Sequence, residues 1–157
     1  MSNELKLYLS GTTFRFFFSD KGYNDGGYFW TDACISVENR YFNYQTGSGF
    51  LEFSELKEIN DSLINLLNGC ITEKRKLEFL EPDLQIYLNP KFDKRNDQQY
   101  TYIKEGFEIE DISAEFNFYL SLDDGYTEER YTLPLYRSDI EQLVEFLSEK
   151  IERLTKS

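Results

Sequence analysis

Histidine is absent from the 157 residues of this chain. Its absence removes the commonest general base, the commonest metal ligand and every triad that needs an imidazole. A phosphate-binding loop is missing too, because Gly47-Ser48-Gly49 is not followed by Lys and Ser or Thr. The sequence therefore predicts no catalytic residue, no metal site and no cofactor, and an enzyme is the least favoured class of function.

Long hydrophobic runs are also missing. A run such as Phe16-Phe17-Phe18 is far shorter than the roughly 20 apolar residues that span a bilayer. Residues 1–10 lack the cationic and apolar segments of a secretory signal. The two cysteines, Cys34 and Cys70, lie among apolar neighbours, which is typical of reduced, buried thiols in the cytosol. We expect a cytoplasmic protein that makes no disulfide and does not bind a membrane.

Basic residues are few, with 17 Lys and Arg against 29 Asp and Glu, and the net charge of −12 would repel nucleic acid. Hydrophobic residues make up 40% of the chain and aromatic residues 17%, which is enough to form a core despite this charge. The length is that of one domain, so we expect residues 1–157 to fold as a single unit.

The first third of the chain is rich in aromatic and β-branched residues, which favour strands. The expected elements are a hairpin of Glu4 to Leu9 and Thr12 to Ser19 about Ser10-Gly11, a loop from Asp20 to Gly27, a strand from Tyr28 to Glu38 and a segment from Arg40 to Tyr44 that pairs back on it.

Leucine and isoleucine then recur at helical spacing from Leu56 to Leu67, with Ser54 placed to cap the start and Gly69 to end it. Two short strands are expected next, Leu77 to Leu80 and Leu84 to Leu88. The segment from Asn89 to Asp111 has little periodicity, and a loop of this length is usually either functional or disordered.

Asp124-Gly125 predicts a two-residue hairpin turn between alternating strands. Pairing about this turn places all the apolar residues on one face, as a half-buried antiparallel hairpin requires. The expected pairs are Phe118 with Tyr131, Phe116 with Leu133 and Ala114 with Leu135, and Tyr119 opposite Arg130 is expected to form a cation–π pair.

The chain ends with a second predicted helix, whose start is marked by a capping box of Ser138 and Glu141. Its apolar stripe runs from Ile140 to Leu154. The order of strands, helix, strands and helix predicts an α+β fold, in which an antiparallel sheet of about seven to nine strands carries two helices on one face.

Acidic residues are concentrated between Glu105 and Glu129, where nine acids occur with no Lys or Arg. Carboxylates with interleaved tyrosines suit a basic protein partner, although a merely solvated face explains the same pattern. The carboxylates Asp123, Asp124, Glu128 and Glu129 could also serve a hydrolase, but the acid of a glycosidase needs a pKa raised by burial in a cleft, and a hairpin tip is ordinarily wet. Their spacing does not match the twelve-residue calcium loop, so a solvated turn is the plain interpretation. The candidate partner-binding residues are Glu105, Glu108, Glu110, Asp111, Glu115, Tyr119, Asp123, Asp124, Tyr126 and Glu128.

The order of segments resembles the WapI family of immunity proteins, small bacterial proteins that protect a cell from the toxic C-terminal domain of a polymorphic or contact-dependent toxin. The residues that carry the resemblance are Tyr28-Phe29-Trp30 through Val37, Phe50-Leu51-Glu52-Phe53-Ser54-Glu55-Leu56, Leu77-Glu78-Phe79-Leu80-Glu81-Pro82-Asp83-Leu84, Tyr131-Thr132-Leu133-Pro134-Leu135 and Ile140 to Leu154.

This resemblance implies a non-enzymatic inhibitor that covers the active site of a cognate toxin domain or a surface beside it. An acidic inhibitor suits a nuclease toxin, whose cleft is basic because its substrate is a polyanion. The alternative from another class is a small-molecule-binding α+β domain with an apolar pocket. Edge strands also leave a homo-oligomer open.

Overall fold

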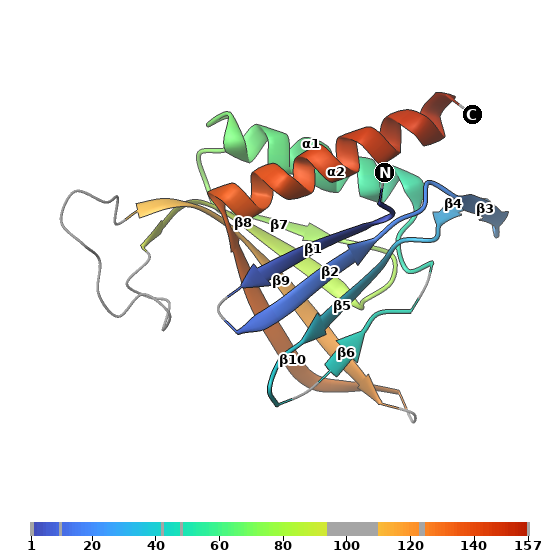
Figure 1. Cartoon of the computed structure of the whole chain (residues 1–157), viewed down its shortest axis with the longest axis horizontal. Helices are drawn as coiled ribbons and strands as arrows, with labels where there is room; N and C mark the ends of the chain where they lie inside the picture. Colours follow the sequence, from blue (N-terminus) through green and yellow to red (C-terminus); the bar gives the residue numbers. More distant parts are fainter. Residues whose placement is uncertain are drawn as a thin grey trace.

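The computed structural model describes residues 2–9, 11–41, 43–47, 49–93, 110–122 and 125–156, which form antiparallel strands and two helices (Figure 1). The elements are β1 (Glu4–Leu9), β2 (Thr12–Phe17), β3 (Gly22–Asp25), β4 (Tyr28–Thr31), β5 (Cys34–Glu38), β6 (Asn43–Gln45), α1 (Phe53–Leu67), β7 (Arg75–Glu78), β8 (Leu84–Asp93), β9 (Glu110–Leu122), β10 (Gly125–Tyr136) and α2 (Arg137–Lys156). Among the described residues the strands form three sheets, in the orders β1-β2-β5-β6, β10-β9-β8-β7 and β3-β4. The predicted α+β class is confirmed, with the strands divided among three sheets.

The first sheet, β1-β2-β5-β6, begins with the predicted hairpin. Leu7 pairs with Phe14, and Gly11 between the two strands has a φ of +86°, which glycine adopts at little cost. Side chains alternate along β2, so that Phe16 is fully buried while Phe17 faces outward. Strand β6 pairs with β5, close to where the sequence predicts a returning segment.

The small sheet β3-β4 was not expected, because its first strand lies in the segment predicted as a loop, Asp20 to Gly27. Gly26 and Gly27 have φ values of +61° and +86° and connect β3 to β4, so they form the turn of a hairpin. The predicted strand from Tyr28 to Glu38 is correspondingly interrupted at Asp32. Its first part pairs with β3, whereas its second part, β5, pairs with β2.

The second sheet, β10-β9-β8-β7, contains the predicted hairpin with its register confirmed. Phe118 pairs with Tyr131, and the other two predicted pairs of this hairpin are also present. The predicted turn at Asp124-Gly125 is wrong, since Gly125 pairs with Leu122 inside the ladder. The register of β9 against β10 shifts at an irregularity between Tyr126 and Arg130. From Arg130 to Tyr136 the pairing is as predicted, because burial of one face fixes it, whereas nearer the turn the pairing differs.

The segment from Asn89 to Asp111, predicted as irregular, is regular at both ends. Strand β8 continues to Asp93 and β9 begins at Glu110, while residues 94–109 lie outside the described part of the chain. Strand β7 begins and ends two residues before the predicted strand from Leu77 to Leu80.

The two helices begin earlier than predicted. Helix α1 is capped by Glu52 in a capping box with Glu55, so Ser54 is not its cap. Helix α2 begins at Arg137, which excludes the predicted box of Ser138 and Glu141. Apolar periodicity marks the buried part of a helix, and the first turn can extend beyond it. The end of α1 is as predicted, with a left-handed glycine two residues after its last turn.

The hydrophobic core lies between the two large sheets and beneath both helices (Figure 1). The ring of Phe14 in β2 meets that of Phe116 in β9 edge to face, with centroids 5.6 Å apart. Phe16 makes a similar contact with Phe146 of α2 at 6.2 Å. These contacts join the first sheet to the second sheet and to a helix. Both cysteines are free, but Cys70 is exposed rather than buried, because it follows the end of α1.

A buried carboxylate connects the start of α1 to the turn between β7 and β8. The two oxygens of Glu55 accept hydrogen bonds from the backbone N–H groups of Glu52, at 3.0 Å, and of Leu80, at 2.7 Å. Burial raises the pKa of this carboxyl group, while the two hydrogen bonds oppose the rise. Glu55 therefore satisfies two backbone donors, one at the start of its own helix and one 25 residues further along the chain.

We expect Glu55→Gln to lower the free energy of unfolding by about 1–3 kcal/mol, because an amide has one acceptor oxygen and its NH₂ group would face the other backbone donor. Urea denaturation of both proteins at pH 7 measures this difference. Glu58→Gln is the matched control, since Glu58 is exposed on the same helix. Equal losses in the two variants would contradict the role assigned to Glu55.

The start of α2 should make stability depend on pH. The Tyr136 N–H donates to Asp139 at 3.0 Å, and burial raises the pKa of this carboxyl above its ordinary value of 3.8. Such a group binds its proton more tightly in the folded state, so its contribution to stability is full below that value and is lost as pH rises through the folded pKa. Asp139→Asn keeps the acceptor oxygen but does not titrate.

The unfolding free energy of the wild type minus that of Asp139→Asn should therefore decrease as pH rises through this window. Denaturant titrations at several pH values from below 4 to 7 measure the difference. A difference that stays constant or increases with pH would exclude this contribution from Asp139.

Candidate partner-binding surfaces

The outward face of the second sheet carries a continuous set of polar contacts. On β9, Glu115 accepts a hydrogen bond from the Asn89 side chain at 2.9 Å, and the same amide donates to the Ser113 hydroxyl at 2.9 Å. On the neighbouring strand, Thr132 contacts Asn117 at 3.2 Å. Alternation along the strands places these groups opposite the buried phenylalanines. The face is polar, and its groups bind one another.

Two of the predicted site residues are paired with arginines. The Arg130 guanidinium lies 3.9 Å from the centre of the Tyr119 ring, which confirms the predicted cation–π pair, and it donates to Gln85 at 3.0 Å. Arg137 of α2 donates to Asp111, with a shortest distance of 2.8 Å, and the Asp111 side chain is only 14% exposed. Both partners come from β10 or the helix that follows it.

The predicted site residues whose side chains the structure describes, Asp111, Glu115 and Tyr119, lie on one strand, β9. Alternation along the strand places them on the same face of the sheet. Glu105, Glu108, Asp123 and Asp124 lie outside the described residues, as do the side chains of Glu110, Tyr126 and Glu128.

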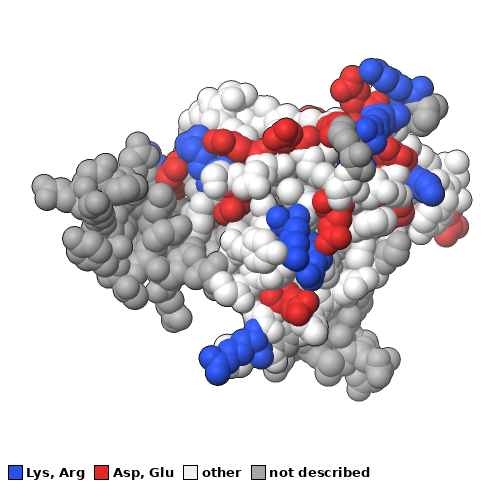
Figure 2. Space-filling model, viewed as in Figure 1, with Lys and Arg blue, Asp and Glu red and all other residues white. Residues whose placement is uncertain are grey.

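Cations also occur on this face, contributed by strands outside the acidic segment. Lys74 and Lys76 lie 5.1 and 5.7 Å from the centre of the Tyr87 ring, and Lys76 pairs with Glu78 at 2.7 Å. A count of charges between Glu105 and Glu129 misses Lys74 and Lys76, because β7 and the residue before it lie outside that segment of the sequence. Acidic side chains also lie in a row along helix α2 (Figure 2).

The outward face of the first sheet is a second candidate surface, and sequence reasoning missed it. Among the described residues, two large aromatic side chains of this sheet are exposed, those of Tyr8 in β1 and Phe17 in β2, and Tyr23 and Tyr28 are exposed on the small β3-β4 sheet. Tyr8 is 74% exposed and Phe17 is 40% exposed. The run Phe16-Phe17-Phe18 contained the signal, because three consecutive side chains of a strand cannot all face the core.

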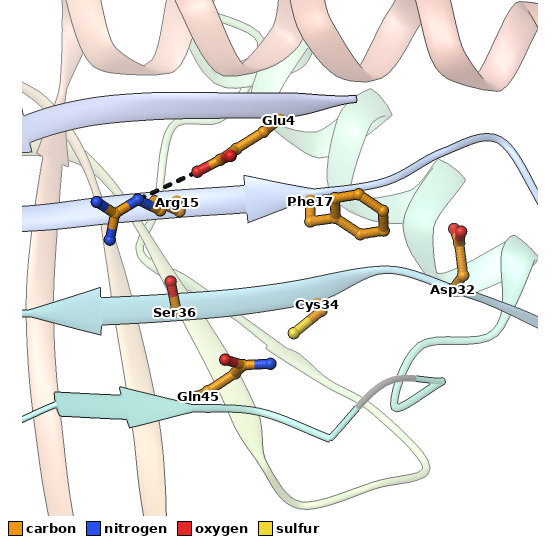
Figure 3. Close-up of a pocket in the computed structure, with 7 residues that line it drawn as sticks. All are labelled: Glu4, Arg15, Phe17, Asp32, Cys34, Ser36 and Gln45. Carbon is orange, nitrogen blue, oxygen red and sulfur yellow. Dashed lines mark ion pairs between the residues drawn. The ribbon is translucent and has the colours of Figure 1, made fainter. Parts of the chain in front are cut away.

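This outward face contains a hollow of about 330 Å³, lined from β1, β2, β5, β6 and the turn at Asp32 (Figure 3). Arg15 lies at one end, where it pairs with Glu4 at 3.1 Å and with Glu38 at 3.3 Å. Phe17 and Asp32 lie toward the other end (Figure 3). The rings of Phe14 and Phe116 lie in the core between the two large sheets, on the side of the first sheet opposite to this hollow.

The part of the chain that the structure describes contains no cluster of three or more His, Cys, Asp or Glu side chains that could hold a metal ion. Within the same residues, no helix is long and apolar enough to cross a membrane.

An α+β domain with exposed aromatic residues and charged sheet faces has the features of a protein-binding module. The profile of the Immunity protein WapI-like family matches residues 2–155, and the chain belongs to this family. Membership implies neutralisation of a cognate toxin, and the family is generally non-enzymatic. No curated protein matches the chain.

Proposed function

We propose that this chain is the immunity protein of a toxin domain, which it binds directly and keeps inactive in the cytoplasm of the cell that makes both proteins. The observation that carries the proposal is the family match, which covers all but three residues at the two ends. The protein acts as a stoichiometric inhibitor and transforms no substrate. Its exposed aromatic residues supply the rigid contact area that protein interfaces favour.

The partner presents a basic surface. A net charge of −12 accelerates the encounter with a cationic domain and disfavours nucleic acid as a competitor. A nuclease toxin fits this description, since its cleft is basic in order to bind a polyanion. The inhibitor's carboxylates then occupy the place of the phosphates.

Within the acidic segment, the hairpin-end residues Asp123, Asp124 and Glu128 are the better candidates for contact with the toxin. Asp111 at the other end of β9 is already neutralised by Arg137, and Glu115 accepts a hydrogen bond from Asn89. Removing either of these carboxylates from its partner on binding would leave a cation or a donor unpaired, which costs free energy.

The test is a binding measurement with the purified toxin domain encoded next to this chain, at low and high salt. Wild-type protein should form a one-to-one complex that weakens as salt increases. Asp123→Lys, Asp124→Lys and Glu128→Lys together should weaken it by about tenfold or more without unfolding the domain.

The matched control reverses three exposed glutamates on the helices, Glu58, Glu141 and Glu145, and therefore makes the same change in net charge. If both triple variants bind equally, net charge alone decides affinity and the hairpin end is not the site. If the wild type neither binds the toxin domain nor protects cells that express it, the proposed function is wrong.

A further inference from the structure

We propose that the hollow on the outward face of the first sheet receives a basic side chain, arginine or lysine, of the toxin domain. This inference rests on the proposed function, and it concerns where the partner is held and by which chemistry. It places a contact surface on the first sheet, whereas the acidic segment belongs to β9 and β10 of the second sheet.

Strand pairing brings the groups of the hollow together in two rows. Ser36 of β5 pairs with Arg15 of β2 on one side and with Gln45 of β6 on the other, and in the next row Cys34 pairs with Phe17. Because paired residues project to the same face of a sheet, these side chains surround one depression (Figure 3). Its floor therefore belongs to a hydrogen-bonded sheet and is held rigidly.

The end of the hollow away from Arg15 suits a cation. The half-exposed Phe17 ring presents a negative π face, and the carboxylate of Asp32 lies at the same end (Figure 3). Asp32 accepts hydrogen bonds from the backbone and hydroxyl of Ser19, which fix its position. A carboxylate has about four acceptor sites, so acceptor capacity remains for a guest.

Arg15, the cation in the lining, does not neutralise the end of the hollow formed by Phe17 and Asp32. Arg15 pairs with Glu4 of the lining and with Glu38 beside it, so its charge is balanced by two carboxylates. Asp32 then adds a further negative charge to the hollow. An anionic guest would meet this surplus of carboxylates, whereas a cation would complement it.

Size and surroundings favour a side chain of a protein over a free metabolite. At about 330 Å³ the hollow is at the lower limit of small-molecule sites, which enclose most of their ligand in about 300–1,000 Å³. It opens outward over the sheet (Figure 3), and the exposed Tyr8 stands on the same face. At the centre of a protein interface, an arginine or aromatic anchor typically fills a pocket, and the contacts around it exclude water.

Gln45 offers a nearly isosteric test, because it is exposed in the lining of the hollow and Gln142 is equally exposed on α2. Gln45→Lys adds a positive charge and Gln45→Glu a negative one, and the same changes at Gln142 alter net charge identically. Affinity for the purified toxin domain is measured by calorimetry for all four variants and the wild type.

We expect Gln45→Lys to weaken binding by about tenfold or more and Gln45→Glu to strengthen it, because the first repels and the second attracts a cationic guest. Both Gln142 variants should stay within about threefold of the wild type, since charges beyond a Debye length are largely screened. Size-exclusion chromatography of each variant alone shows whether self-association changes.

Several outcomes would overturn the inference while leaving the proposed function intact. With the wild type still binding the toxin domain, equal affinities for the Gln45 and Gln142 variants would exclude the hollow from the interface. If Gln45→Lys strengthens binding and Gln45→Glu weakens it, the guest is acidic. If substitution of Gln45 changes the oligomeric mass of the unbound protein, the occupant of the hollow is a second copy of this chain. If the wild type fails to bind the toxin domain, the proposed function itself fails.

Discussion

The contact between the rings of Phe14 and Phe116 is the constraint on which the rest of the structure depends. It joins the inward faces of the two large sheets, and each sheet can bury its apolar residues only against the other sheet and the helices. Once these faces are turned inward, alternation along the strands of the two large sheets sends the remaining side chains to the opposite faces. The two outward faces, where a partner can bind, are thus consequences of how the core is closed.

The two outward faces differ in how their charges are used. On the second sheet, Glu115, Tyr119 and Asp111 all bind groups of the same molecule. These contacts hold the three side chains in defined positions. On the first sheet, the exposed Tyr8 and Phe17 share a face with a hollow that has the paired Arg15 at one end and the carboxylate of Asp32 at the other. An inhibitor that must bind one toxin tightly benefits from such rigid anchors, because less conformational entropy is lost on association.

Local patterns predicted those parts of the fold that depend on residues close in sequence. The register of Phe118 with Tyr131 followed from alternation, and the end of α1 followed from Gly69, as both the buried face and the left-handed glycine are local requirements. The caps were harder to predict. Glu52 and Glu55 lie just before the apolar stripe begins, and no periodic signal distinguishes them from exposed acids. The Gly26-Gly27 pair is a turn signal in the sequence, but the turn formers around it favour a loop over the short β3-β4 hairpin.

The candidate site shows the same division. The sequence by itself determined the acidity, the absence of histidine chemistry, the strand and helix types and the resemblance to immunity proteins, because each depends on composition or on short-range order. Only the tertiary structure decided that Arg137 neutralises Asp111, that Lys76 lies beside Tyr87, and that strands from three different parts of the first 45 residues form one hollow. The reason is physical: electrostatic and packing contacts depend on distance in space, and the pairing of strands far apart in the chain sets that distance.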